Sequence, residues 1–264
     1  MAKEKAESGG IVETIKTVFW ALVIAFAFRT LFFQPFWIPS ASMKDTLLVG
    51  DFLFVNKMAY GYSRYSCPFG LCPIPGRIFA SEPERGDVIV FRHPTTGEDY
   101  IKRLIGLPGD RIQMKNGILY INDVEAPQKP DGVFEETYAP QGPKGSTPKC
   151  ANAPLDIGET CEKPRAIETL PGGASHDVLN ITTSSGFPDN TDVYTVPEGH
   201  YFFLGDNRDN STDSRFRQGA MGGVGMVPAE NLIGRADRIM FSSAGARIWY
   251  FWTWRTDRFF KAIE

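Results

Sequence analysis

The chain has 264 residues, of which 42% are hydrophobic and 22% charged, with 26 Gly and 19 Pro. This size and composition predict one sizeable β-rich domain, or a domain with a large insertion, together with an accessory segment. The formal net charge of −3 and the pI of about 5.7 provide no basic face, so they exclude nucleic acid as an expected partner.

The most apolar part of the sequence is residues 11–33, with eleven uninterrupted apolar residues at 18–28. As a helix, this stretch would reach about 34 Å, which exceeds the roughly 30 Å of a bilayer's hydrocarbon core. We therefore predict a transmembrane anchor over 11–33 in the lipid bilayer. A cleavable signal peptide is the main alternative, because Ala25-Phe26-Ala27 has the small-x-small form of a cleavage site.

Flanking cations predict how the anchor is oriented. Lys3, Lys5 and Lys16 precede or open the span, whereas Arg29 and then Lys44 are the cations near its far end. Because positive charge favours the cytoplasmic side, residues 1–10 are expected to be a cytoplasmic tail. The rest of the chain is expected on the outer face of the membrane.

After the anchor, apolar runs of strand character follow one another. Asn116-Gly117 lies between two such runs and is a strong hairpin signal. We expect an all-β domain with a coiled antiparallel sheet, in two parts at 34–123 and 191–245. The expected strand runs are 51–58, 86–93, 99–106, 110–123, 192–206 and 231–242.

Residues 124–190 are rich in Pro, Gly, Ser, Thr and Asp, and we predict an inserted region of loops and short strands there. The four cysteines are Cys67, Cys72, Cys150 and Cys161. Two local disulfides in an oxidising compartment are the simplest interpretation, although four cysteines allow three pairings. No CxxC motif is present, so no zinc site or other metal is expected.

The tail, residues 246–264, begins with seven aromatic residues among three cations and one acid at 246–260. Such a segment is typical of a terminal element docked on the core. It is equally typical of a contact with the membrane surface, where Trp and Arg lie at the level of the lipid headgroups. The sequence leaves both interpretations open.

Two serines, Ser40 and Ser42, follow the anchor, and a serine nucleophile needs a base. None of the three histidines has a sequence context that suggests a triad. Lys102 is an alternative base, because strand alternation places it between Tyr100 and Leu104 on an apolar face. Burial there would favour the neutral amine. Lys44 is closer in sequence, but we expect it to face solvent and its replacement to matter little.

Four segments in this order resemble the signature boxes of the bacterial type I signal peptidases, which are membrane-anchored serine proteases with a Ser–Lys dyad. They are "PSASMKDTLLVGDFLFVNK", "GDVIVF", "DYIKRLIGLPGDRI" and "GDNRDNSTDSR". The resemblance runs from about residue 11 to 238, with the middle insertion unmatched. It implies removal of signal peptides from secretory preproteins at the bacterial inner membrane, near the export machinery and without a cofactor.

The resemblance also implies roles for individual residues. Ser42 matches the nucleophile, Lys102 the general base, and Ser40 a hydroxyl that completes an oxyanion hole with the backbone N–H of Ser42. Ser211 matches the serine that orients the lysine amine. The charged residues that brace the site would be Arg103, Asp206, Asp213 and Arg215.

Substrate binding is expected along an extended segment, because Pro39 pushes Ile38 towards the β region. Such a segment can pair with an extended peptide. By resemblance, Phe36, Ile38, Tyr100 and Ile101 would form shallow pockets for Ala at the first and third positions before the cut.

The sequence departs from the family pattern in two places. The usual Ser-Met-x-Pro-Thr has Asp45 instead of Pro, and residues 216–228 form a longer stretch than expected. Two alternative functions stay open: a self-cleaving repressor relative, and a non-enzymatic anchored β-domain that binds extracytoplasmic partners. An acid-rich structural turn is the alternative for the segment around Ser211.

Overall fold

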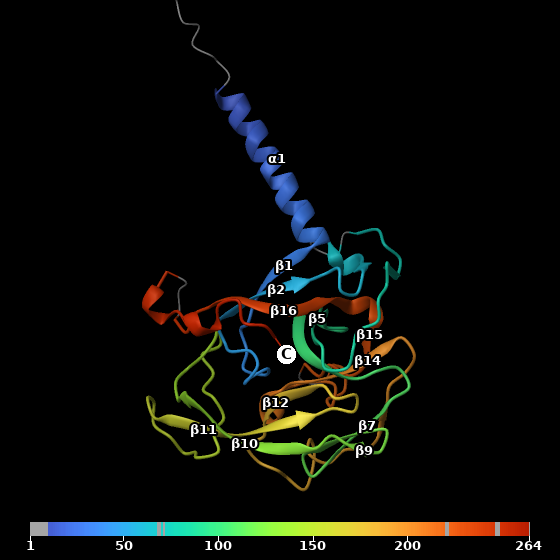
Figure 1. Cartoon of the computed structure of the whole chain (residues 1–264), viewed down its shortest axis with the longest axis vertical. Helices are drawn as coiled ribbons and strands as arrows, with labels where there is room; N and C mark the ends of the chain where they lie inside the picture. The colour runs from blue at the N-terminus through green and yellow to red at the C-terminus, as the bar shows by residue number, and fades with distance from the viewer. Residues whose placement is uncertain (1–9, 68–69, 71, 220–221, 246–248, 264) are drawn as a thin grey trace, which may run out of the picture.

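A computed structural model describes residues 10–67, 70, 72–219, 222–245 and 249–263. A single long helix, α1 (Gly10–Leu31), protrudes from a body made of β-strands (Figure 1). The expected all-β body with one N-terminal apolar helix is confirmed. The predicted tail at residues 1–10 lies outside the described residues, apart from Gly10.

Helix α1 has 22 residues and a mean hydropathy of 1.9 in its most apolar window, enough by length and composition to cross a membrane. It buries none of its side chains against the rest of the described chain. An apolar surface on all sides is what a helix that crosses a bilayer needs, so the prediction of a membrane anchor is compatible with this helix.

The main sheet is antiparallel and has seven strands. Register shifts in β16 and β14 mark bulges, which bend strands and increase their twist, so the sheet curls. The strands in spatial order are β1 (Phe33–Trp37), β2 (Asp51–Asn56), β16 (Leu232–Ser242), β5 (Val88–Arg92), β6 (Asp99–Gly106), β14 (His200–Leu204) and β15 (Val227–Pro228).

Two smaller antiparallel sheets accompany the main sheet, and the first contains the hairpin predicted within 110–123. Asn116 and Gly117 both have positive φ, 49° and 77°, and form the turn of the predicted hairpin. The four-stranded sheet has the order β13 (Tyr194–Thr195), β7 (Arg111–Lys115), β8 (Ile118–Ile121) and β9 (Val124–Glu125). The two-stranded sheet pairs β3 (Tyr62–Ser63) with β4 (Arg77–Ile78).

The insertion is more regular than predicted. It forms a three-stranded antiparallel sheet at the end of the molecule opposite α1 (Figure 1): β10 (Gln128–Thr137), β11 (Thr160–Thr169) and β12 (Ser175–Leu179). The expectation of short strands is wrong for β10 and β11, each of ten residues. We call these two strands and the segment that joins them the insertion hairpin.

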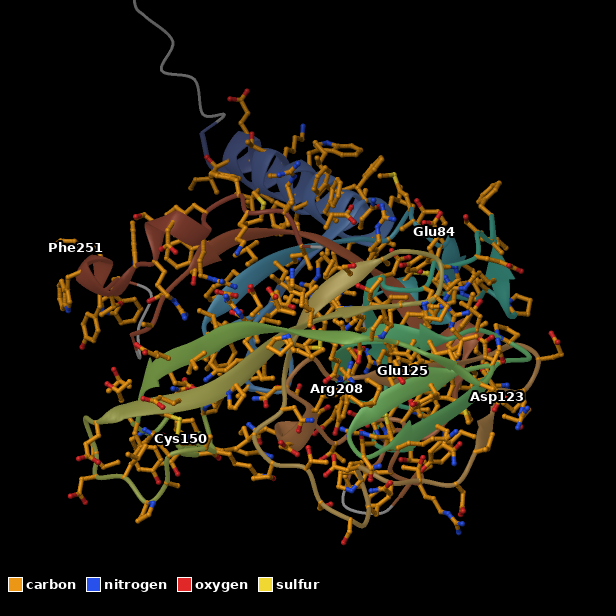
Figure 2. All side chains as sticks on the ribbon, turned by 60° about the horizontal axis from the view of Figure 1, so that its bottom comes forward. Glu84, Asp123, Glu125, Cys150, Arg208 and Phe251 are labelled. Carbon is orange, nitrogen blue, oxygen red and sulfur yellow. A yellow bond between two sulfur atoms is a disulfide. The ribbon has the colours of Figure 1, made fainter. Side chains whose placement is uncertain are left out.

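Both predicted disulfides are present, Cys67–Cys72 and Cys150–Cys161. The second joins the segment between the hairpin strands to β11 near one edge of the molecule (Figure 2). Of the three pairings that the sequence allows, the local one is confirmed.

The described part of the tail is docked on the main sheet, and isolated bridges join Arg238 to Ala262 and Ser243 to Trp254. Arg258 is buried and donates to both carboxylate oxygens of Asp51. Five aromatic side chains of the described tail nevertheless stay exposed, and Phe251 projects from the edge of the molecule (Figure 2). They are Trp249, Phe251, Trp252, Trp254 and Phe260. Docking is thus confirmed, and the membrane contact stays a prediction.

Candidate active site

Ser42 and Lys102 are 60 residues apart in sequence and form a direct hydrogen bond. Lys102 Nζ lies 2.6 Å from Ser42 Oγ and 3.0 Å from the carbonyl oxygen of Ile101. Both side chains are buried, with 7% of Ser42 and 4% of Lys102 exposed. A hydroxyl and an amine at this distance can exchange a proton directly.

The surroundings of Lys102 weaken its hold on a proton. Burial lowers the pKa of the amine to about 8, although Asp213 and Asp206 act in the opposite direction. At pH 7 about a tenth of such lysines are neutral, roughly a few hundred times more than for a solvated lysine. The burial predicted from strand alternation is therefore present.

Ser40 lies next to this pair but is exposed. Its Oγ is 3.4 Å from Ser42 Oγ, at the outer limit of a hydrogen bond. The hydroxyl is thus close to the reacting oxygen, and its part in an oxyanion hole stays a prediction.

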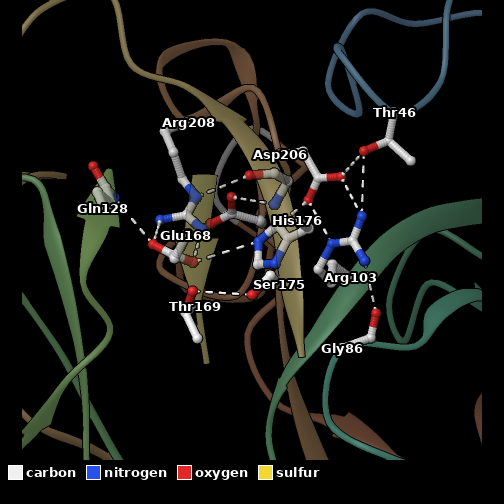
Figure 3. Close-up of polar contacts among 12 residues, drawn as sticks. Thr46, Gly86, Arg103, Gln128, Glu168, Thr169, Ser175, His176, Asp206 and Arg208 are labelled. Atoms are coloured by element: carbon white, nitrogen blue, oxygen red, sulfur yellow. Dashed lines mark hydrogen bonds and ion pairs between the residues drawn. The ribbon is translucent and has the colours of Figure 1, made fainter. Parts of the chain in front are cut away.

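The two sides of the site are held together by a buried ion pair (Figure 3). Arg103, the neighbour of Lys102 on β6, donates from Nε and Nη2 to the two oxygens of Asp206, at 2.9 and 2.8 Å. Thr46 Oγ1, four residues after Ser42, donates to Asp206 at 2.5 Å. Although burial opposes its ionisation, Arg103 holds the pKa of Asp206 below the usual range. The predicted bracing charges Arg103 and Asp206 therefore meet.

Asp213 and Arg215 form the second predicted pair, with two N–H···O bonds of 2.9 Å. Asp213 also accepts from the backbone N–H of Gly205 at 3.1 Å. Gly205 is required here, because a Cβ would come within 2.2 Å of Ser211 Oγ and 2.5 Å of the Ser42 carbonyl oxygen. The loop thus brings Ser211 close to the nucleophile.

The hydrogen bond expected between Ser211 and Lys102 is not formed. Ser211 Oγ is buried and makes no hydrogen bond to Lys102; against the effect of burial, it acts with Arg215 to hold the pKa of Asp213 below the usual range. Lys102 Nζ instead bonds Ser42 and the Ile101 carbonyl. The interpretation of Ser211 as the group that orients the amine therefore stays a prediction.

Sequence reasoning missed a third buried charge cluster behind the site (Figure 3). Arg208 donates to both oxygens of Glu168 on β11, at 2.9 and 2.5 Å. His176 on β12 lies 3.4 Å from the same carboxylate, and burial lowers its pKa. Arg208 stands within the matched acidic box and could have been considered. Glu168 and His176 stand in the insertion, outside the four signature boxes, where no spacing identified them.

Asn207 was also missed. Its backbone N–H donates to the carbonyl of Ser42 at 3.2 Å, and its side chain donates to the carbonyl of Ala41 at 3.0 Å. The acidic loop therefore fixes the main chain of the nucleophile itself. The expectation that this segment is only a solvated turn does not fit these contacts.

The prediction that Lys44 faces solvent is wrong. Only 2% of Lys44 is exposed, and its Nζ donates to Glu136 and, at 2.7 Å, to Gln141 Oε1. Burial lowers the pKa of Lys44 to about 8, against the attraction of Glu136. The sequence could not identify these partners, because they stand more than 90 residues away.

The predicted substrate-binding residues flank the nucleophile on two segments. Phe36, Tyr100 and Ile101 are half-buried, Ile38 is buried and Pro39 is exposed. Two cavities, of about 1280 and 920 Å³, are lined by other residues. In the described parts of the chain, no cluster of His, Cys, Asp or Glu side chains could hold a metal ion.

The amino-acid sequence matches known proteins over most of its length. Residues 11–241 match the family described as "Signal peptidase, peptidase S26". Signal peptidase I of Rickettsia typhi is 40% identical over 245 residues, covering 88% of this chain and 82% of the relative. That of Rickettsia canadensis is 42% identical over 236 residues, covering 86% and 79%.

Among solved structures, the chain is similar to a crystal structure of a signal peptidase I from Enterococcus faecalis V583. The two are 28% identical, with a TM-score of 0.30, and the match covers 59% of this chain and 97% of the other.

Proposed function

This chain belongs to the signal peptidase family, peptidase S26, and on that premise we propose that Ser42 and Lys102 form its catalytic dyad. Membership of a peptidase family argues against the alternative of a non-enzymatic binding domain. The observation that carries the proposal is the 2.6 Å contact between Ser42 Oγ and a buried amine whose pKa is about 8.

The proposed mechanism is acyl transfer to serine. Neutral Lys102 takes the proton of Ser42 as Oγ attacks the scissile carbonyl, and the resulting ammonium then gives that proton to the departing amine. Water, deprotonated by the same lysine, afterwards releases the acyl group. The Ser40 hydroxyl and the Ser42 N–H would stabilise the negative oxygen, each by a few kcal/mol.

We propose that cleavage follows small-x-small sequences such as Ala-x-Ala. The preprotein would lie extended along residues 36–39 and beside Tyr100 and Ile101, whose half-buried side chains would admit only small substrate side chains. Specificity would then be steric, because a pocket closed by packed side chains rejects larger groups.

We further propose that α1 anchors the enzyme in the bacterial inner membrane, with the β-body on its outer face. Its length, its apolar composition and its lack of burial in the described chain support this. The exposed aromatics of the tail would then rest on the lipid surface. Protease added to the outer face of spheroplasts should digest the β-body, and protection of the β-body would contradict the orientation.

The proposed function is tested by incubating the purified full chain with a preprotein in detergent. We expect one cut, located by N-terminal sequencing directly after an Ala-x-Ala site. Replacing the last Ala of that site by Trp should abolish the cut, because the side chain no longer fits. Cleavage of both substrates at equal rates would contradict the steric specificity.

The pH dependence of the reaction follows from the lowered pKa of Lys102. Only the neutral amine acts as base, so kcat/KM should rise about tenfold per pH unit below pH 8 and level off near that value. A peptide that spans the cleavage site is a suitable substrate for this measurement. A midpoint near 10.5, the value of a solvated lysine, would rule out the buried neutral base.

A further inference from the structure

The insertion hairpin contacts the chain on both sides of Ser42. Before Ser42, the loop that follows β10 presses on Pro39, because a Cβ on Gly142 would lie 2.5 Å from the Pro39 carbonyl oxygen. After Ser42, Lys44 and Asp45 each bind a charged group of the hairpin. We call residues 39–47 the nucleophile loop.

The contact at Lys44 is buried and fully paired. Glu136 of β10 accepts from Lys44 on one carboxylate oxygen and from Lys163 of β11 on the other. Gln141 also bonds both Lys44 and Glu136, at 2.7 Å each. Side-chain exposure is 2% for Lys44, 11% for Glu136 and 1% for Lys163. Charges this deeply buried stay with their partners, because separating them leaves an uncompensated charge.

The contact at Asp45 is more exposed, and it is a second ion pair between the nucleophile loop and the insertion hairpin. Arg165 of β11 lies 3.1 Å from the Asp45 carboxylate and 2.8 Å from that of Asp131 on β10. Position 45 is where the family pattern has Pro, whose ring fixes the backbone. Asp45 lacks that ring, and its side chain makes an ion pair that a proline could not make.

The other face of the nucleophile loop is held by the catalytic body. Met43 and Leu47 are fully buried in its core, and Asn207 binds the carbonyls of Ala41 and Ser42. The hairpin therefore supplies the remaining side of the support. Since proton transfer needs Ser42 at 2.6 Å from Lys102, a shift of this loop by about 1 Å would slow the reaction about a hundredfold.

We propose that the insertion hairpin positions the nucleophile, with Lys44, Glu136 and Gly142 as positioning residues. This inference rests on the proposed function of Ser42 and Lys102. It gives the insertion, which lies outside the four signature boxes, a definite task in the reaction.

Lys44→Met is the first test, because it leaves Glu136 paired with Lys163 and so leaves no buried charge alone. We expect kcat for a preprotein to fall about 10- to 100-fold. KM and the pH midpoint near 8 should stay within error, because neither the substrate contacts nor Lys102 are changed. The thermal midpoint should not fall, because burial already lowers the pKa of Lys44 and so opposes its charged form. Lys129→Met, an exposed lysine on the same hairpin, is the matched control and should keep full activity.

Gly142→Ala tests the other flank without changing a charge. Gly142 and Gly145 stand in the same loop with similar φ, +67° and +59°, so alanine strains the backbone equally at both. At 145 the nearest atom is 4.0 Å away, whereas at 142 the new Cβ would collide with Pro39. Gly142→Ala should therefore lower kcat about tenfold or more, and Gly145→Ala should not.

The outcomes separate the two proposals. If the unchanged protein cleaves the preprotein and both Lys44→Met and Gly142→Ala keep kcat within twofold, the hairpin does not position the nucleophile. If the unchanged protein does not cleave, the proposed function itself fails. The rate at which a serine-directed acylating probe labels Ser42 then becomes the measure of loop position, and equal rates in all variants would overturn the inference.

Discussion

Lys102→Met is expected to abolish signal-peptide cleavage and, at the same time, to make the protein more stable at pH 7. Activity should fall at least about 10⁴-fold, because no other base lies at hydrogen-bond distance from Ser42 Oγ in the described chain. Methionine has nearly the length and volume of lysine, so the packing around position 102 is kept.

The gain in stability follows from the direction of the pKa shift. In the unfolded chain Lys102 holds its proton up to about pH 10.5, whereas in the folded protein burial lowers the pKa to about 8. Between these values the unfolded state binds more protons, so folding becomes more favourable as the pH rises. Below pH 8 the buried ammonium costs about 3 kcal/mol, and loss of its bond to Ser42 returns about 1 kcal/mol of that.

The net effect of Lys102→Met at pH 7 is therefore an increase of about 1 to 3 kcal/mol in the free energy of unfolding, measured with urea. Ser42→Ala is the control, since it should remove activity equally but leave the buried amine in place without this gain. Equal stability of the two variants at pH 7, or activity in either, would contradict the picture of a buried, weakly basic lysine.

Such a lysine could be recognised from sequence because its signals are local. Strand alternation placed Lys102 between apolar neighbours, and the matched boxes stood in the right order around Ser42 and Lys102. The hairpin turn at Asn116-Gly117 was equally readable, because two adjacent residues decide it. Fold class and the pair at the centre of the site therefore followed from short windows of sequence.

The predictions that were wrong or missing concern side chains whose partners lie far away in the sequence. Lys44 is polar and adjacent to Asp45, which is typical of a solvated turn, yet Glu136 covers it from 92 residues away. Glu168 and His176 give no pattern of their own, because charge pairing across a fold leaves no spacing in the sequence. Only the tertiary structure brings these groups together.

The length of the strands in the insertion was predicted wrongly for another reason. β10 contains Pro130 and Gly132, which are disfavoured within strands, and its register shifts between Pro130 and Val133. The bulge absorbs both residues and leaves a ten-residue strand with its exposed side chains outside. A composition that predicts a loop is thus compatible with an edge strand, because pairing with β11 holds β10 in the extended conformation.

Asp206→Asn should destabilise the fold by about 3 to 5 kcal/mol, because it removes the carboxylate charge that is paired with the buried guanidinium of Arg103. Asp206 and Arg103 are 1% and 2% exposed, and their closest atoms are 2.8 Å apart. The lowered pKa of Asp206 means that the wild-type ion pair stabilises the protein above about pH 4 and is lost as the pH falls further. Activity should fall as well, since Asp206 accepts from Thr46 of the nucleophile loop, and its chain neighbour Asn207 donates to the Ala41 carbonyl of the same loop.

The chain offers a matched control for this variant. Arg111 and Asp123 also lie 2.8 Å apart, but their side chains are 52% and 63% exposed. Asp123 has a φ of +66°, a conformation that asparagine adopts readily, so Asp123→Asn introduces no backbone strain. Because water already solvates both charges, Asp123→Asn should change the free energy of unfolding by less than about 1 kcal/mol. Urea unfolding at pH 7 compares the two variants directly. A similar loss of unfolding free energy in both variants would contradict the prediction that burial decides how much an ion pair stabilises this protein.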